Sequence, residues 1–313
     1  MMQQLVAGID IGGTNTVFGL VNKNGEILLK ESVSTEEFPL PGDLVTTVCD
    51  HITKAFSQFK NNYELKGIGI GAPNGNYFNG TIEFAPNLKW NGIVPLAKMF
   101  SEKLNVKAVL TNDANAAAVG EMMFGGAKGM KDFIFITLGT GLGSGIVVNG
   151  EMVLGHDGFA GEIGHIIVVP EGRQCACGRK GCLETYCSAT GIKRTYADLI
   201  MSHHDKANIQ ARVTDAKYIY EKAIQGDKDA IDAFNFTGKM LGLALANSVA
   251  YTSPKAIFLF GGLALAGNFI FEPTIKYFEK NLLNIYKNKI KILPSQLKEN
   301  DAAILGAASL IFK

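Results

Sequence analysis

The sequence predicts an α/β fold that contains an internal duplication. Two apolar runs of strand length, residues 5–11 and 133–138, each lead into a turn of glycine and threonine, a second short strand and an Asn-Gly turn. Aligning Gly12 with Gly139 brings the two Asn-Gly turns to the same place within two residues. Elsewhere, runs of strand length alternate with stretches of helical periodicity, as is typical of α/β domains.

The composition is that of a folded globular protein with room for two domains. The chain has 313 residues, 47% of them hydrophobic, and its 30 basic and 29 acidic side chains leave a formal net charge of +1. This balance argues against a broad nucleic-acid or membrane surface, which would need a basic face. No apolar run approaches the roughly 20 residues that span a bilayer, and no signal peptide opens the chain, so we expect a cytoplasmic protein.

The first apolar run is expected to form a buried strand that ends beside a glycine turn. Asp10 stands at the end of this strand, so its carboxylate and the backbone of residues 12–14 would face one cleft. Amides in such a turn can form a nest for an anion. A plain glycine hairpin is the alternative. Strand 17–21 and the turn at Asn24-Gly25 complete a three-stranded meander.

The rest of the first half alternates between helices and strands. A helix begins at Pro41, with apolar residues at helical spacing up to residue 59, and a strand follows at 66–71. Residues 71–91 form a loop rich in asparagine and glycine, and loops of this length in compact domains are usually functional. A second helix is expected from Pro95 to about Leu104, followed by a strand at 106–110.

This last strand ends in two polar residues and passes directly into an alanine-rich helix over residues 114–123. Asn112 and Asp113 therefore stand at the carboxyl end of a strand, which is where open α/β sheets bind ligands. Simple capping of the helix by either residue is the alternative. Two polar residues exceed what one cap requires, so we take Asp113 as a candidate for chemistry.

Three cysteines within eight residues and one preceding histidine predict a structural zinc site. The four candidate ligands are His165, Cys175, Cys177 and Cys182. Three sulfurs and one nitrogen form a set that tetrahedral Zn²⁺ prefers, and four protein ligands close its coordination sphere. A disulfide within the cluster, or buried cysteines beside a satisfied core histidine, are the alternatives, and a reduced cytosolic setting favours the metal. A bare zinc site does not need the flanking carboxylates of Glu162 and Glu184.

The C-terminal part is predicted to be largely helical. A polar region at 191–225 is helix-forming, with His203-His204-Asp205 as a solvated turn, and a long amphipathic helix covers 229–251. Strand 256–260 ends in Gly261-Gly262, where the backbone could contact the base or ribose of a nucleotide, although tight packing would also explain two glycines. Helix 301–310 is built of small residues and can pack closely on another helix.

Together these residues resemble the ROK family of bacterial sugar kinases, and within it the ATP-dependent glucokinases. The resemblance covers nearly the whole chain and rests on the segments 10–14, 112–113, 138–145, 161–165 and 175–184. The cysteine-rich segment is highly specific to the family, whereas the first segment is shared with other kinases of the actin-like group.

The resemblance implies a two-lobed actin-like ATPase fold made of duplicated ribonuclease-H-like domains with a zinc loop. One lobe would comprise residues 1–117 and 301–313, and the other residues 118–300 with the zinc loop. Sugar and ATP would meet between the lobes, and the protein would be a homo-oligomer, either a dimer or a tetramer.

The resemblance also implies roles for individual residues, with Asp113 as the catalytic base that activates a sugar hydroxyl. The substrate-binding residues would be Gly71, Asn87, Asn112, Asp113, Glu162, His165 and Glu184. ATP and Mg²⁺ would be bound by Asp10, Gly12, Gly13, Thr14, Asn15, Gly139, Thr140, Gly141, Gly143, Gly261 and Gly262. One ring nitrogen of His165 would ligate zinc while the other reaches a sugar hydroxyl, so the metal would orient the ring.

The implied activity is transfer of the γ-phosphate of ATP to O6 of glucose. Kinases of this family that act on N-acetylglucosamine or N-acetylmannosamine share the Asn-Asp and Glu-x-x-His motifs, so these motifs do not choose the sugar. The segments 71–74 and 87–90 resemble the glucokinase versions, which favours glucose. The family also includes transcriptional repressors, so a catalytically silent sugar-sensing regulator is the alternative from another functional class.

Overall fold

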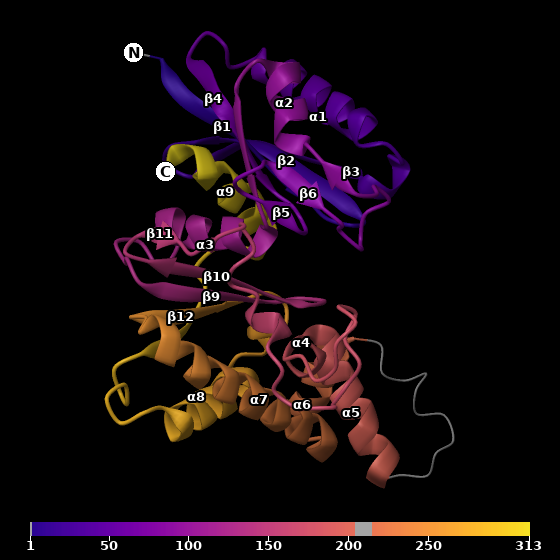
Figure 1. The fold of residues 1–313 in the computed structure, drawn as a ribbon, viewed down its shortest axis with the longest axis vertical. Helices are drawn as coiled ribbons and strands as arrows, with labels where there is room; N and C mark the ends of the chain where they lie inside the picture. Colours follow the sequence, from indigo (N-terminus) through magenta and orange to yellow (C-terminus); the bar gives the residue numbers. More distant parts are fainter. Residues whose placement is uncertain (1, 204–214) are drawn as a thin grey trace. The chain divides into compact units, whose positions relative to one another are not determined.

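The computed structural model describes residues 2–203 and 215–313 of the chain. They form two compact units, each with its own sheet (Figure 1). Unit 1 contains Met1–Met130, Glu151–Gly161 and Gln296–Lys313, and unit 2 contains Lys131–Gly150 and Glu162–Ser295. In these described parts, no helix combines the length and the apolarity needed to cross a bilayer.

Unit 1 is built on a five-stranded sheet with the order β3-β2-β1-β4-β8. Its strands are β1 (Gln3–Ile11), β2 (Asn15–Asn22), β3 (Ile27–Ser34), β4 (Tyr63–Gly71) and β8 (Lys107–Thr111). Strands β1 to β3 pair antiparallel, which confirms the predicted meander. Strands β1, β4 and β8 run parallel, so their carboxyl ends meet at one edge of the sheet.

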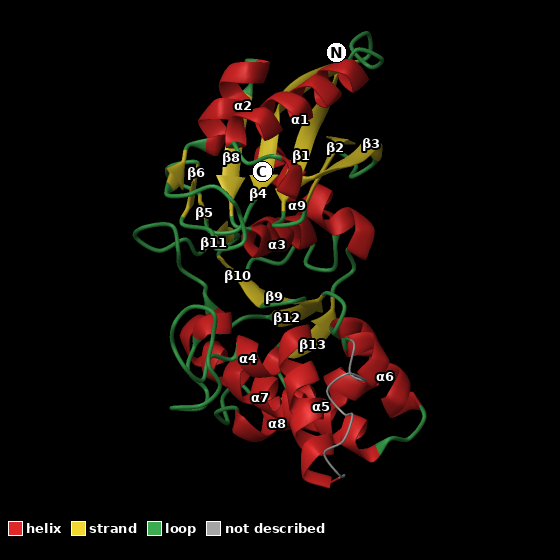
Figure 2. Ribbon diagram, turned by 90° about the vertical axis from the view of Figure 1, so that its right-hand side faces the viewer, coloured by secondary structure: helices red, strands yellow, loops and turns green. Residues whose placement is uncertain are grey.

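Helices cover both faces of this sheet, and Figure 2 shows them from the side. The helices of unit 1 are α1 (Pro41–Phe56), α2 (Leu96–Leu104), α3 (Asp113–Phe124) and α9 (Glu299–Phe312), with the short helix η1 (Thr35–Glu37). Helices α1 and α2 share one apolar core with the sheet, while α9 packs against β1, β4 and α3. A Cβ at Gly69 would lie 1.7 Å from the carbonyl oxygen of Ala307, so only glycine lets β4 lie this close to α9.

The predicted irregular loop at 71–91 contains a small sheet of its own. Three short strands, in the order β5-β6-β7, are formed by β5 (Gly75–Asn76), β6 (Thr81–Glu83) and β7 (Ile93–Val94). Strands of two or three residues are too short to show the alternation of apolar and polar residues from which strands are predicted. The short strand β11 (Glu151–Met152) also falls in unit 1.

Unit 2 repeats the strand arrangement of unit 1. Within its sheet, β10 (Leu142–Val148) lies antiparallel to β9 (Phe133–Leu138), and β9 lies parallel to β12 (Ala256–Phe260). Strand β13 (Lys291–Pro294), which the sequence did not reveal, pairs parallel with β12. The series β10-β9-β12-β13 therefore matches β2-β1-β4-β8 in order and direction, which confirms the predicted duplication.

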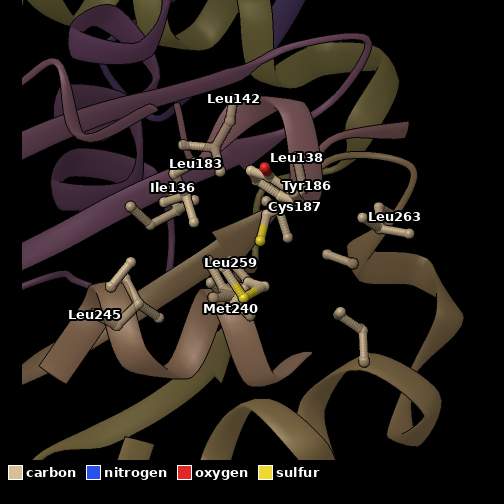
Figure 3. Packing of buried hydrophobic residues seen from close by; sticks show 14 of the residues in the cluster. Ile136, Leu138, Leu142, Leu183, Tyr186, Cys187, Met240, Leu245, Leu259 and Leu263 are labelled. Carbon is tan, nitrogen blue, oxygen red and sulfur yellow. The ribbon is translucent and has the colours of Figure 1, made fainter. Parts of the chain in front are cut away.

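The helices of unit 2 surround a large apolar cluster (Figure 3). They are α4 (Glu184–Cys187), α5 (Ala189–His203), α6 (Ala216–Ile224), α7 (Lys228–Thr252) and α8 (Asn268–Asn281), with the short helices η2 (Ile163–His165) and η3 (Ala264–Ala266). Helix α8 follows the Gly261-Gly262 pair, and its apolar side packs on α7. The expected turn at residues 203–205 starts at the end of α5, and its last two residues lie outside the described part of the chain.

The boundary expected near Ala117 falls inside a helix. Ala117 belongs to α3, and this helix packs along α9 at Gly120 and Gly306. A Cβ at Gly120 would lie 2.8 Å from the Cα of Gly306, so the two helices are in backbone contact. All of α3 therefore belongs to unit 1, which continues to Met130.

Candidate functional site

Unit 1 brings two predicted carboxylates together at the carboxyl edge of its sheet. Asp10 in β1 pairs with Gly71 in β4, and Gly71 pairs with Thr111 in β8. A Cβ at Gly71 would lie 3.0 Å from Oδ1 of Asp10 and 3.6 Å from the Cα of Asp113. Gly71 thus keeps open the space between the two acidic residues.

The side chains of Asn112 and Asp113 have different hydrogen-bonding roles at the start of α3. Asn112 is the N-cap of α3, and its Oδ1 accepts a hydrogen bond of 2.7 Å from the amide of Asn115. Asp113 is the first residue of the helix, and its Oδ1 accepts a bond of 2.8 Å from the amide of Ala114. The capping alternative therefore applies to Asn112, whereas the carboxylate of Asp113 is oriented by one amide and exposed to solvent.

The pKa values of both carboxyl groups, those of Asp10 and Asp113, are raised above the ordinary value. Burial, and to a smaller extent the nearby charge of Asp113, together raise the pKa of Asp10 to about 7. Although the Asp113 side chain reaches solvent, the protein atoms packed around it remove part of its hydration and raise its pKa, and the hydrogen bond from Ala114 opposes this shift. A carboxylate with a raised pKa binds a proton more readily, which suits a general base that works near neutral pH.

The first glycine turn, residues 12–15, contains an internal hydrogen bond and lies against the loop that contains Asn87. The amide of Gly12 donates to the carbonyl of Asn15 over 2.9 Å, and the carbonyl of Thr14 accepts from the amide of Thr35 over 2.7 Å. A Cβ at Gly13 would lie 2.7 Å from the carbonyl oxygen of Asn87. Asn87 is therefore placed beside this turn, within the same unit as Asp10 and Asp113.

In unit 2, the four predicted zinc ligands converge. Their ligand atoms, one each from His165, Cys175, Cys177 and Cys182, all lie within 4.8 Å of one another. The Cys177 and Cys182 sulfurs are 3.6 Å apart, and the Cys175 sulfur lies 3.7 Å from Nδ1 of His165. Tetrahedral Zn²⁺, with bonds of ~2.0–2.3 Å, needs such atoms roughly 3.5–3.8 Å apart. The geometry fits zinc, and all five cysteines of the chain are free thiols.

The thiols of this cluster differ in pKa. Burial alone would raise the pKa of Cys177, but hydrogen bonds from the backbone and side chain of Arg179 outweigh it and lower this pKa to about 6. Burial raises the pKa of Cys175 to about 12. Because the thiolate is the form that binds a metal, Cys177 offers a ligand at neutral pH before any ion has arrived.

Glu184 contacts both the cysteine cluster and the second glycine turn, which consists of residues 139–143. Its Oε2 accepts a hydrogen bond of 2.9 Å from the amide of Leu142, and its Oε1 lies 3.9 Å from the Cys175 sulfur. A Cβ at Gly141 would lie 2.4 Å from the same Oε2, so a larger residue there would displace the Glu184 carboxylate. His165 turns Nδ1 toward the Cys175 sulfur, so Nε2 is the ring nitrogen that does not face this thiol.

Several amides of the second glycine turn are already bonded within the protein. Gly139 donates to the carbonyl of Gly141 over 3.1 Å, Gly143 donates to Oγ1 of Thr137 over 3.0 Å, and Leu142 donates to Glu184. The amides that remain for an anion are those of Thr140 and Gly141. Like the first glycine turn in unit 1, this turn can therefore offer a short nest of backbone amides to an anion.

The structure provides a packing reason for the first glycine of the Gly261-Gly262 pair. Gly261 has a φ of +98°, and a Cβ there would lie 2.8 Å from the carbonyl oxygen of Leu138. The alternative of tight packing thus accounts for Gly261. A nucleotide contact at Gly262 stays a prediction.

Two residues that the sequence analysis did not single out hold this region together. The guanidinium of Arg173 donates to the carbonyl of Thr185 over 3.0 Å and lies 4.8 Å from the ring centre of Tyr186. The hydroxyl of Thr190 donates to the carbonyl of Thr140 over 2.9 Å. Neither belongs to a recognisable motif, and the only sequence signal is their position on either side of the cysteine cluster.

Comparison with known proteins identifies what the chain is similar to. The ROK family profile matches residues 6–313. The glucokinase of Halalkalibacterium halodurans is 35% identical, over 99% of this chain and 96% of the relative. The xylose repressor of Bacillus subtilis is 29% identical, over 97% of this chain but 76% of the relative. Among solved structures, the glucokinase from Streptomyces griseus in complex with glucose and AMPPNP is 33% identical, covers 98% of both chains and has a TM-score of 0.78.

Proposed function

Since this chain belongs to the ROK family, we propose that it transfers the γ-phosphate of ATP to O6 of glucose. The observation that supports catalysis most directly is that the cap at the start of α3 is formed by Asn112 and not by Asp113. Asn112 caps the helix, so Asp113 is left as an accessible carboxylate with a raised pKa. The relatives with glucokinase activity in their names support the choice of sugar, and the structure with bound AMPPNP supports ATP as the donor.

Phosphoryl transfer needs positioning and charge stabilisation more than covalent chemistry by the protein. In the proposed reaction Asp113 accepts the proton of the sugar O6 hydroxyl as this oxygen forms a bond to the γ-phosphorus. The bond between that phosphorus and the bridging oxygen breaks, and ADP leaves. The remaining sugar hydroxyls would be bound by Asn112, Glu162, His165 and Glu184, with Gly71 and Asn87 as further contacts.

Mg²⁺, when bound with ATP, would neutralise charge on the phosphates. Asp10 is the residue of unit 1 that fits this ion, through a water molecule, because carboxylate oxygen is a hard ligand. Its raised pKa supports this role, since a cation would stabilise the ionised form that burial and Asp113 disfavour. The zinc site would be structural, because its four protein ligands complete the sphere.

The choice of sugar can be tested by measuring ADP release over a panel of sugars with Mg-ATP. We expect glucose to have the highest kcat/KM, 2-deoxyglucose and N-acetylglucosamine to be poorer, and mannose to lie between. A site that hydrogen-bonds a hydroxyl rejects analogues that lack it, because its own polar groups are then left unpaired.

Other outcomes of the panel lead to different assignments. Faster turnover of N-acetylglucosamine or N-acetylmannosamine than of glucose would overturn the glucose assignment and retain a sugar kinase. Sugar binding without turnover of any panel member would favour a sugar-sensing regulator, the class to which the Bacillus subtilis relative belongs by name.

The pH dependence of kcat/KM should have an acid limb well above the range of an ordinary carboxyl, which is about pH 4. Asp113 must be ionised to accept a proton, and the protein atoms packed around it raise its pKa, so activity should be lost as the pH falls through this raised value. A wild-type rate that stays constant down to about pH 4, while circular dichroism shows a folded protein, would contradict this role of Asp113.

A further inference from the structure

The second glycine turn is held by the chain segment that follows the cysteine cluster. This segment, Glu184–Thr190, contains α4 and the start of α5 and is called the α4–α5 junction below. Its Ala189 amide donates to the carbonyl of Gly139 over 2.8 Å, and its Thr190 hydroxyl donates to the carbonyl of Thr140 over 2.9 Å. Its Glu184 carboxylate accepts from the amide of Leu142 over 2.9 Å. The junction therefore contacts three consecutive peptide groups and the start of β10.

These contacts determine where the two unbonded amides of the turn point. The carbonyl of Gly139 and the amide of Thr140 belong to one planar peptide group, and the carbonyl of Thr140 and the amide of Gly141 belong to the next. In a trans peptide the N–H points away from the C=O, and the described chain contains no cis peptide. Because α5 binds both carbonyls, both N–H groups are directed away from α5, toward the open side of the turn.

The junction is also attached to the cysteine cluster. The amide and hydroxyl of Thr185 both donate to the carbonyl of Cys182, over 3.0 and 2.7 Å. Arg173, two residues before the first cysteine, donates to the carbonyls of Thr185 and Gly191 over 3.0 and 3.2 Å. Its side chain is only 12% exposed and also bonds Oγ1 of Thr195 over 2.9 Å.

Apolar packing makes the connection rigid. Figure 3 shows Leu183, which immediately precedes the junction, and Cys187, which lies within it, beside Leu138 and Leu142, the residues that flank the turn. All four are almost completely buried in the same cluster. Well-packed interiors transmit displacements rather than absorb them, so a shift of the junction would shift the turn.

From this geometry we propose that the α4–α5 junction positions the second glycine turn for ATP, with Thr190 and Arg173 as positioning residues. The metal loop, residues 162–184, which contains the four zinc ligands, then orients the nucleotide site as well as the sugar site. This inference rests on the proposed function, in which the amides of Thr140 and Gly141 bind a phosphate of ATP. Neither Thr190 nor Arg173 is required to touch the nucleotide.

Thr190→Val tests the proposal because it removes the hydroxyl and keeps the shape of the side chain. We expect the KM for ATP, and the Kd for AMPPNP measured by calorimetry, to rise roughly 3- to 10-fold, the range for losing one hydrogen bond. The KM for the sugar should not change, and Thr190→Ser should restore nucleotide affinity because it keeps the donor. Thr252→Val is a matched control, since this hydroxyl makes the same kind of bond, over 3.0 Å to the carbonyl of Ser248 in α7.

Arg173→Lys tests the path between the cysteine cluster and the turn. Lysine keeps the charge but not the planar fork that contacts several acceptors, so the KM for ATP should rise while bound zinc, measured by elemental analysis, is retained.

Unchanged AMPPNP affinity in both Thr190→Val and Arg173→Lys would overturn the inference, as would equal losses of sugar and nucleotide affinity. If the wild type binds AMPPNP but phosphorylates no sugar, the proposed function fails and the calorimetric comparison still decides the inference.

Discussion

Replacing Asp113 with asparagine is expected to lower kcat by about 10²- to 10⁴-fold, the usual contribution of a positioned acid or base. Asparagine has the same shape, and its Oδ1 can still accept the bond from the amide of Ala114 that orients Asp113. The amide cannot take a proton from the sugar hydroxyl. Sugar affinity should therefore be largely kept, and steady-state rates together with calorimetric sugar binding would separate the two effects.

A matched control is Asp43→Asn, which neutralises an exposed carboxylate in the first turn of α1. Asp43 also stands near a helix start in unit 1 but outside the strand edge that holds Asp10 and Gly71, so its rate should stay close to that of the wild type. An Asp113→Asn variant that keeps more than about a tenth of the wild-type rate would exclude Asp113 as the base. Glu162 would then be the next candidate.

The purified protein is expected to contain one zinc ion per chain, and Cys177→Ala is expected to release it. Cys177 is the exposed member of the cluster and has the lowered pKa, so its loss removes the readiest thiolate without opening a cavity in the core. Three ligands would remain, which leaves an open and weaker site. Sugar affinity should fall before global stability does, because the metal loop contains Glu162, His165 and Glu184.

Elemental analysis and thermal unfolding test this expectation. Cys49→Ala is the control, since Cys49 is buried in the core of unit 1 whereas the cluster belongs to unit 2, so zinc content should not change. The zinc interpretation would be refuted by metal-free protein in which Cys175 and Cys182 are joined by a disulfide under reducing conditions. Comparing Cys177→Ala with Arg173→Lys then shows whether weaker ATP binding follows from metal loss or from loosening of the α4–α5 junction.

Much of the fold followed from local patterns of residues. The strands at 5–11 and 133–138, the helix that begins at Pro41 and the helix after Asp113 all lie where periodicity and turn residues placed them. The duplication was visible because both copies use the same order of strand, glycine turn and strand. The cysteine cluster was predictable for the same reason, since its ligands are close along the chain and zinc restricts the residue types that can bind it.

Other elements gave no local signal. The strands of the small sheet within 71–94 are too short for an alternating pattern, and β13 has only four residues. Helix α8 contains Pro273 at an interior position, which weakens a helical prediction from sequence. Ala117 was a reasonable boundary along the chain, but the packing of α3 on α9 joins residues from opposite ends of the sequence.

The sequence by itself determined which chemical groups this protein possesses: the carboxylates of Asp10 and Asp113, the thiols of the metal loop and the two glycine turns. Only the tertiary structure decided what each can do. Whether Asn112 or Asp113 caps α3 depends on side-chain geometry, and the raised pKa of Asp10 depends on burial and on a residue distant in sequence. The direction of the Thr140 and Gly141 amides depends on hydrogen bonds from α5 to the neighbouring carbonyls. Proton affinity and the orientation of a peptide group are set by neighbours in space, and the linear order of residues does not state which neighbours these are.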